Sequence, residues 1–139
     1  MSDAERFAVI FDGLQQAYGT FEIDRTSSNG KSQGKARVIR EPRTTEHFQQ
    51  HLAGQGAGIG IIPINEEDKC IWGCIDIDEY PLDHVKLIER IRHAKLPLVV
   101  CRSKSGGAHC FIFCTDWIPA KTMQSTLQHL ASGLGYGGC

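Results

Sequence analysis

The segment Cys74-Ile75-Asp76-Ile77-Asp78 alternates apolar and charged residues with a period of two. Such alternation is typical of a β-strand that has one face against a core and the other face open. It places the isoleucines of this run, together with Ile71, on the covered face and both aspartates on the open face. We therefore predict an α+β fold, with an antiparallel or mixed sheet and helices packed on one face.

Hydrophobic periodicity and cap residues predict the elements around that strand. In chain order we expect a helix from Ser2 to about Ala17, strands at 20–23 and 36–39, a helix at 45–52, a buried strand at 58–64, the strand at 70–78, a helix capped by Asp83, strands at 98–102 and 109–114, and a helix from Pro119 to Gly133. The strands at 58–64 and 70–78 would form one hairpin, and the last two strands a second. Residues 1–54 would be a small N-terminal α/β module and 55–139 the main sheet.

Composition places the chain among ordinary globular proteins. Its 139 residues are 41% hydrophobic and 22% charged, which supports a core and excludes a disordered chain. No apolar run approaches the ~20 residues of a membrane span. The first residues are acidic where a secretory signal would be basic, so we expect a soluble cytoplasmic protein without a membrane partner.

Six cysteines occur in this chain without a secretory signal, so we expect reduced and mostly buried thiols rather than a disulfide framework. Strand alternation would place Cys70 with Cys74, and Cys110 with Cys114, on one face of their strands. A zinc site is the alternative interpretation.

The formal net charge of −1 does not by itself indicate a nucleic-acid partner. Basic residues nevertheless gather in residues 25–43, where six of them accompany a single acid and leave a formal charge of +5. This segment could follow a nucleic-acid backbone, although a solvated loop would have the same composition. The basic residues are Arg25, Lys31, Lys35, Arg37, Arg40 and Arg43.

The two aspartates of the alternating strand form a candidate metal site. Two carboxylates on one face repel each other unless a cation lies between them, and oxygen ligands suit Mg²⁺ or Mn²⁺. The alternative is a solvated strand end before the turn at Tyr80-Pro81, because aspartate is common near turns.

The loop before residue 109 contains two glycines, two hydroxyls and two cations, which together suit a polyphosphate. It leads into a strand and lacks the GxxxxGK[ST] order, so it is no Walker loop. A lone histidine at a strand start is more often structural, but its position beside this loop favours phosphate contact. The candidate residues are Arg102, Ser103, Lys104, Ser105, Gly106, Gly107 and His109.

A strand with Asp-x-Asp, then a helix, then a hairpin whose loop ends in Ser-Gly-Gly-x-His resembles the first two motifs of the archaeo-eukaryotic primase superfamily. The closer resemblance is to the primase domain of TOTE conflict systems and related phage and plasmid proteins. Further matching segments are Gly30-Lys31, residues 51–54, residues 58–64 and residues 72–78.

The resemblance implies an RRM-like palm that catalyses nucleotidyl transfer from nucleoside triphosphates onto a nucleic-acid strand. It assigns Asp76 and Asp78 as the catalytic pair that holds Mg²⁺ or Mn²⁺, and residues 102–109 as the nucleotide-binding motif. The basic residues of 25–43 would bind a single-stranded DNA template, and a longer protein could include a helicase domain.

The family also has a third motif after the last helix, with an acidic residue that completes the metal site. Residues up to Cys139 do not contain it, so we expect an N-terminal fragment or an unusual member, with weak or no polymerase activity by itself. Two other functions use the same residues. One is a metal-dependent nuclease, and the other is a non-catalytic module that binds nucleotides or nucleic acid.

Overall fold

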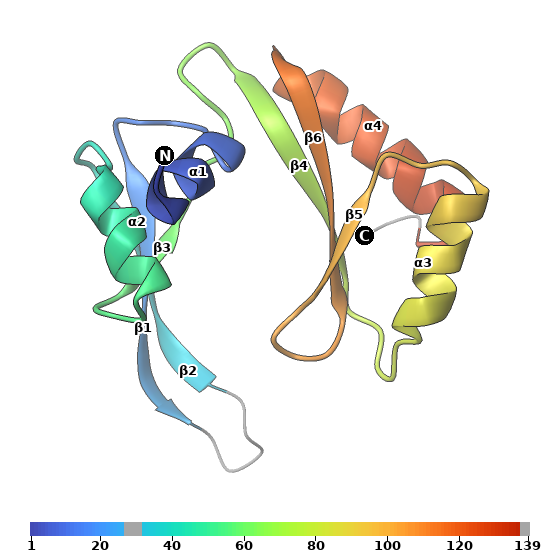
Figure 1. Cartoon of the computed structure of the whole chain (residues 1–139), viewed down its shortest axis with the longest axis horizontal. Coiled ribbons are helices and arrows are strands. Elements are labelled where there is room, and N and C mark those ends of the chain that lie inside the picture. Colours follow the sequence, from blue (N-terminus) through green and yellow to red (C-terminus); the bar gives the residue numbers. More distant parts are fainter. Residues whose placement is uncertain (27–31, 137–139) are drawn as a thin grey trace. The chain divides into compact units, whose positions relative to one another are not determined.

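The computed structural model describes residues 1–26 and 32–136. The chain divides into two compact units, which we call unit 1 (Met1–Glu67) and unit 2 (Asp68–Cys139) (Figure 1). The division falls later in the chain than the predicted one after residue 54. The predicted strand at 58–64 therefore belongs to unit 1.

Unit 1 contains a small antiparallel sheet and two short helices. Its elements are α1 (Asp3–Ile10), β1 (Tyr18–Thr26), β2 (Ser32–Ile39), α2 (Thr45–Leu52) and β3 (Gly58–Gly60), and its sheet has the order β2-β1-β3. Ser2 caps α1 as predicted: its hydroxyl accepts from the Glu5 N–H, while the Glu5 carboxylate accepts from the Ser2 N–H. Phe48 of α2 is buried in this unit.

Helix α1 ends at Ile10, so the prediction of a helix to Ala17 was wrong. The segment after it runs against the chain near Ile62, whose carbonyl accepts a hydrogen bond from the Leu14 N–H at 2.8 Å. A Cβ at Gly13 would lie 2.2 Å from that same carbonyl oxygen, so only glycine fits there. This tertiary contact overrides the helical periodicity of the sequence.

The predicted hairpin between 58–64 and 70–78 does not form. Strand β3 pairs with β1 instead, with Ile59 opposite Thr20 and Gly60 opposite Gly19. It is also shorter than predicted, because the carbonyl of Ile62 is bonded to Leu14 and Pro63 follows. Apolar residues in 58–64 correctly indicated a strand but did not identify its partner.

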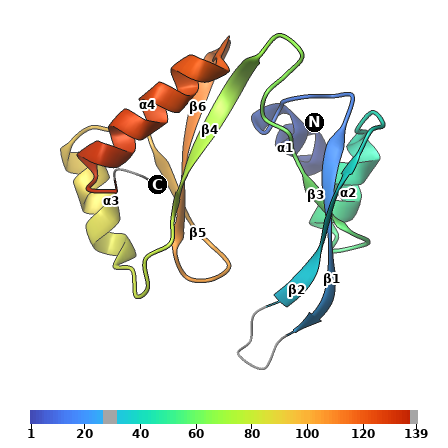
Figure 2. The same ribbon diagram turned by 180° about the vertical axis from the view of Figure 1, so that it is seen from behind.

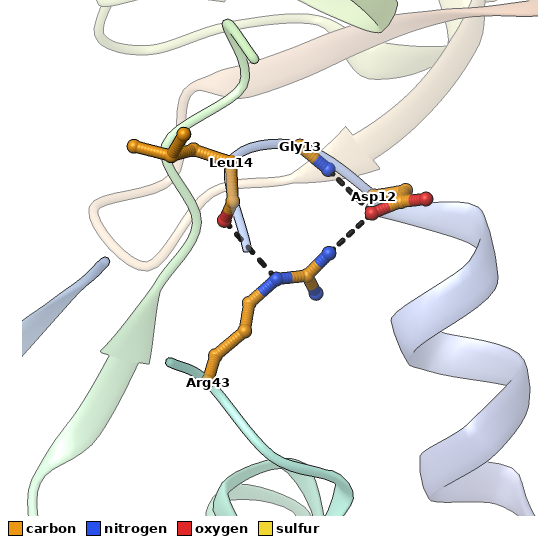
Figure 3. A network of polar contacts seen from close by, with 4 residues as sticks. All are labelled: Asp12, Gly13, Leu14 and Arg43. Carbon is orange, nitrogen blue, oxygen red and sulfur yellow. Dashed lines mark hydrogen bonds and ion pairs between the residues drawn. The ribbon is translucent and has the colours of Figure 1, made fainter. Parts of the chain in front are cut away.

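Arg43 connects the start of α2 to the segment that follows α1 (Figure 3). Its side chain is only 6% exposed and forms an ion pair with Asp12. Its Nε donates to the Leu14 carbonyl at 3.2 Å, and the Gly13 N–H donates to the Asp12 carboxylate at 2.8 Å. The guanidinium also lies over the Phe48 ring, 5.4 Å from its centroid. The buried side chain of Arg43 therefore stabilises unit 1 by joining the segment after α1 to α2.

Unit 2 has one antiparallel sheet with helices on one side, which confirms the predicted α+β arrangement. Its elements are β4 (Lys69–Ile77), α3 (His84–His93), β5 (Val99–Arg102), β6 (Ala108–Pro119) and α4 (Ala120–Gly133), and its sheet has the order β4-β6-β5. Both helices lie on the same side of this sheet (Figure 2). The side chains of the covered face form the main core with α3 and α4; its buried members are Ile75, Ile77, Leu87, Ile91, Ala108, Cys110, Ala131 and Leu134.

The cysteine prediction holds for one pair and was wrong for the other. Cys110 and Cys114 both pack toward the helix-covered side of β6. Cys70 is also buried there, but the β4–β6 register shifts after it, so Cys74 alternates with the buried Gly73 and Ile75 onto the open face. The five cysteines of the described part are all free thiols. Burial raises the pKa of Cys74 and of Cys110 to about 11, so both are weak nucleophiles near neutral pH.

Among the residues that the structure describes, no helix combines the length and the apolar character needed to cross a membrane.

The replacement Arg43→Lys should destabilise unit 1 by on the order of 2 kcal/mol, because an ammonium cannot reproduce the guanidinium contacts with Asp12 and Leu14. Native-state hydrogen exchange of the β1 and β2 amides measures this directly. Arg40→Lys is the matched control, since Arg40 is exposed. Equal protection in the two variants would contradict the structural role of Arg43.

Candidate functional site

Asp76 and His109 face each other across β4 and β6 on the open side of the unit 2 sheet. The flanking Ile75 and Ile77 are buried, so strand alternation turns Asp76 away from the core, and its side chain is 61% exposed. His109 Nε2 lies 3.3 Å from Asp76 Oδ1. The structure thus brings together one residue predicted for the metal and one predicted for the phosphates.

Asp78 follows the end of β4, and its carboxylate oxygen accepts a hydrogen bond from the Tyr80 hydroxyl at 3.0 Å. This hydrogen bond is the main cause of a raised pKa of Tyr80, and the negative charge of Asp76 also contributes. The Tyr80 hydroxyl therefore orients the carboxylate of Asp78. Sequence reasoning treated Tyr80 only as part of a turn.

The glycine loop lies directly against the end of β4. The Ser103 N–H donates to the Gly107 carbonyl, and the Gly106 N–H donates to the Ser103 carbonyl, both at 3.1 Å. Gly106 has a φ of +96°, which favours glycine. A Cβ at Gly107 would lie 2.1 Å from the Ile77 carbonyl oxygen. The absence of a side chain at Gly107 thus lets the loop sit beside the residues that carry the carboxylates.

A side chain of α3 also holds the loop in place, and sequence reasoning missed its role. His84, the first residue of α3, donates through Nε2 to the Gly107 carbonyl at 2.8 Å. The one sequence signal for this contact was the histidine that directly follows the helix cap Asp83.

The hydroxyl of Ser103 is buried and has no hydrogen-bond partner in the part of the chain that the structure describes. A buried polar group in this state costs free energy unless it binds a ligand or water. It lies in the same loop as the exposed Lys104 and follows the exposed Arg102. Hydroxyl, amide and cationic donors in one short loop are the groups that bind phosphate oxygens.

The open-face carboxylates fit a divalent ion that shares its ligands with a phosphate. Within residues 1–26 and 32–136, no group of three or more histidine, cysteine, aspartate or glutamate side chains forms a metal cage. Mg²⁺ usually keeps several waters and is bound by one or two carboxylates together with substrate phosphates. Asp76 and Asp78, exposed beside the glycine loop, match that description.

Glu79 follows Asp78 in the sequence but belongs to a different place. Its carboxylate accepts a hydrogen bond from the Tyr136 hydroxyl at 2.9 Å. It lines a cavity of about 500 Å³ together with Lys86 and Arg90 of α3. Glu79 therefore does not supply a third carboxylate beside Asp76.

The structure describes only part of the basic segment 25–43. Lys35 and Arg37 lie two residues apart on β2 and are exposed, as is Arg40. Arg25 lies in β1, but its side chain is outside the described part, as is the whole of Lys31. Arg43 is buried and paired with Asp12, so we remove it from the predicted nucleic-acid surface.

Comparison with protein families matches residues 15–135 to the family described as the TOTE conflict system, Archaeo-Eukaryotic Primase domain. The match includes both carboxylates, the whole glycine loop and every element except α1. No curated protein matches the chain.

The replacement Gly107→Ala should destabilise unit 2 by about 2–3 kcal/mol, because the new Cβ would force the loop away from Ile77. Gly133→Ala is the matched control: nothing lies within 4 Å of a Cβ there, so it should stabilise α4 slightly. Chemical unfolding followed by tryptophan fluorescence reports on unit 2, which contains both tryptophans, Trp72 and Trp117. Equal stability of the two variants would show that the loop does not depend on this contact.

Proposed function

The chain belongs to the TOTE conflict system archaeo-eukaryotic primase family, and we propose that unit 2 binds a nucleoside triphosphate with a divalent ion for nucleotidyl transfer onto a nucleic-acid strand. The observation that carries this proposal is the placement of the glycine loop against the end of β4, beside Asp76 and Asp78. The strand and helix order of unit 2, with α3 and α4 on one side of the sheet, supports an RRM-like palm.

In this proposal the carboxylates of Asp76 and Asp78 hold Mg²⁺ or Mn²⁺ on the open face. The ion supplies positive charge that activates the attacking hydroxyl and neutralises the leaving phosphates. His109 contacts Asp76 through Nε2 and so fixes the orientation of that carboxylate. Tyr80 does the same for Asp78 through its hydroxyl.

The residues of the loop bind the triphosphate. The Ser103 hydroxyl and the backbone N–H groups of the loop donate hydrogen bonds to phosphate oxygens, and Lys104 and Arg102 supply positive charge. His84 keeps the loop rigid through the Gly107 carbonyl. A preorganised loop binds phosphate without first losing conformational entropy, which favours the bound geometry.

Template binding is assigned to the exposed cations of unit 1, which are Lys35, Arg37 and Arg40. Contacts between such side chains and phosphates are electrostatic and independent of sequence. They would position a single-stranded DNA template without selecting its bases.

A second candidate function is nucleotide or nucleic-acid binding without transfer. Within the described residues no third ligand joins Asp76 and Asp78 to make a metal-binding group, and Glu79 is engaged with Tyr136. A metal that lacks one ligand is poorly positioned, and a misplacement of about 1 Å can cost about a hundredfold in rate. Primer extension by this chain, compared with a longer segment that adds an acidic motif, separates the two functions.

The replacements Asp76→Asn and Asp78→Asn should each weaken Mn²⁺ binding by about tenfold or more, because each removes a charged oxygen ligand. Mn²⁺ titration followed by electron paramagnetic resonance measures the affinity. Asp116→Asn is the matched control, an exposed aspartate farther along β6. Unchanged affinity in the two site variants would refute the metal assignment.

The loop should bind a nucleoside triphosphate about tenfold or more tightly than the matching monophosphate, because its donors suit the outer phosphates. His109→Ala should remove most of this preference, since His109 ends the loop and contacts Asp76. His129→Ala, on the exposed surface of α4, should leave it unchanged. Calorimetric titration in Mn²⁺ makes the comparison; equal binding of both nucleotides by the unmodified chain would contradict the phosphate assignment.

A further inference from the structure

We propose that the cavity between α3 and the end of α4 binds a mononucleotide, with its phosphate on Lys86 and Arg90. We call this cavity the helix cavity; its volume is about 500 Å³, which lies within the range of sites for small organic ligands. The inference does not rest on the proposed function, because the described lining of the cavity contains neither Asp76 nor any residue of the glycine loop.

The most buried part of the lining is apolar and belongs to the main core of unit 2. Leu87 of α3 and Leu134 after α4 are 3% and 4% exposed, and Leu82 packs against the same core. Side chains held in a close-packed core keep their positions without a ligand, so this part of the cavity is preformed. Such a lining favours a ligand with an apolar body over a bare inorganic ion.

The wall that carries Tyr136 is held in place by the end of α4. The Tyr136 N–H donates to the Ala131 carbonyl at 2.8 Å, and the Gly135 N–H donates to the Ser132 carbonyl at 3.0 Å. These are the two hydrogen bonds of a Schellman motif, and Gly135 has the positive φ, +89°, that the motif requires. The motif turns the chain back, so that Tyr136 packs against the core and lines the cavity.

Both carboxylates of the lining already have partners in the chain. Glu79 accepts a hydrogen bond from the Tyr136 hydroxyl at 2.9 Å. Asp83 caps α3, because its carboxylate accepts from the Lys86 N–H at 3.1 Å. Among residues 1–26 and 32–136, no ion pair engages the side chain of Lys86 or Arg90. These two cations are therefore the charged groups of the lining that are available to a ligand.

Lys86 and Arg90 are placed to act on one anionic group. They are four residues apart on α3, so their side chains lie on the same face of the helix, and both are exposed. Burial and the hydrogen bond to Glu79 raise the pKa of Tyr136, whereas the positive charge of Arg90 acts in the opposite direction. The charge of Arg90 thus reaches into the cavity. A guanidinium and an ammonium one turn apart can both contact a single phosphate.

The combination of these groups favours a mononucleotide over other anions. The two cations suit its phosphate, and the apolar part of the lining suits its base. Glu79 uses the oxygen Oε2 for Tyr136, and its other oxygen can accept a hydrogen bond from a ribose hydroxyl. Inorganic phosphate would leave the apolar lining uncovered, and a nucleoside would leave both cations without a partner.

Calorimetric titration of the whole chain with adenosine 5′-monophosphate tests the proposal, in the presence of EDTA so that no divalent ion takes part. We expect it to bind about tenfold or more tightly than inorganic phosphate or adenosine, because each of these lacks one of the two parts. The 2′,3′-dideoxy form should bind about tenfold more weakly, since it has no hydroxyl to donate to Glu79.

Lys86→Gln and Arg90→Gln should each weaken this binding by about tenfold or more, because each removes a charged donor to the phosphate. Both side chains are exposed, so the replacements should leave the fold intact. Arg92→Gln is the matched control, at an exposed cation of α3 outside the cavity lining. In nuclear magnetic resonance spectra, the nucleotide should shift the amide signals of Lys86 and Gly135 more than that of Gly106.

Three outcomes would overturn the inference. Unchanged binding by Lys86→Gln and Arg90→Gln would show that the cations do not hold the phosphate. Binding that is lost in Lys104→Gln but kept in Arg90→Gln would assign the nucleotide to the glycine loop. Tighter binding of a 5′-phosphorylated oligonucleotide than of the mononucleotide would assign the cations to the end of a nucleic-acid strand.

Asp76→Asn separates this inference from the proposed function. It should impair Mn²⁺ binding at the open face while leaving the binding of adenosine 5′-monophosphate in EDTA intact. Loss of mononucleotide binding in Asp76→Asn would contradict a site in the helix cavity. Failure of the metal site alone would leave the affinity of the cavity and its dependence on Arg90 unchanged.

Discussion

The close approach of Gly107 to the Ile77 carbonyl is the contact on which the candidate site depends. No side chain larger than hydrogen fits between them, since a Cβ would lie 2.1 Å from the oxygen. This approach places the glycine loop against the strand end that carries Asp76 and Asp78. His84 then fixes the loop from the other side through the same glycine, whose carbonyl accepts its Nε2–H.

The positions of the charged side chains follow from the packing of α3 and α4 on only one face of the sheet. Helices α3 and α4 pack over Ile75 and Ile77, so alternation leaves the carboxylate of Asp76 on the solvent side. Carboxylates on that side need partners, and the structure supplies His109 for Asp76 and Tyr80 for Asp78. The packing of both helices on one face thus determines on which face of the sheet the proposed metal site lies.

Local patterns predicted the elements that are marked by alternation or by capping residues within a short stretch of sequence. Alternation identified β4, and capping residues identified α2, α3 and the start of α1. Predictions failed where a contact between distant residues determines the local structure. The Leu14 N–H donates to the Ile62 carbonyl, and the helix ends early. Strand β3 pairs with β1 and not with the next strand along the chain. Charge counting placed Arg43 with the exposed cations, although its partner Asp12 lies 31 residues away. His84 was missed for the same reason, because its hydrogen bond to the Gly107 carbonyl exists only once the glycine loop has folded against β4. Tyr80 was missed because it was interpreted only as part of the turn at Tyr80-Pro81.

The most direct test of the account is to locate a bound Mn²⁺ ion by paramagnetic broadening of the amide signals of the intact chain. If the carboxylates and the glycine loop form one site, substoichiometric Mn²⁺ should first broaden the signals of Asp76, Asp78, Gly106, Gly107 and His109. The signals of Cys70 and Ile118, which are paired at the other end of β4 and β6, should persist to higher Mn²⁺ concentrations. Broadening that begins at the acidic turn of residues 66–68 would contradict the placement of the metal on the open face of the sheet.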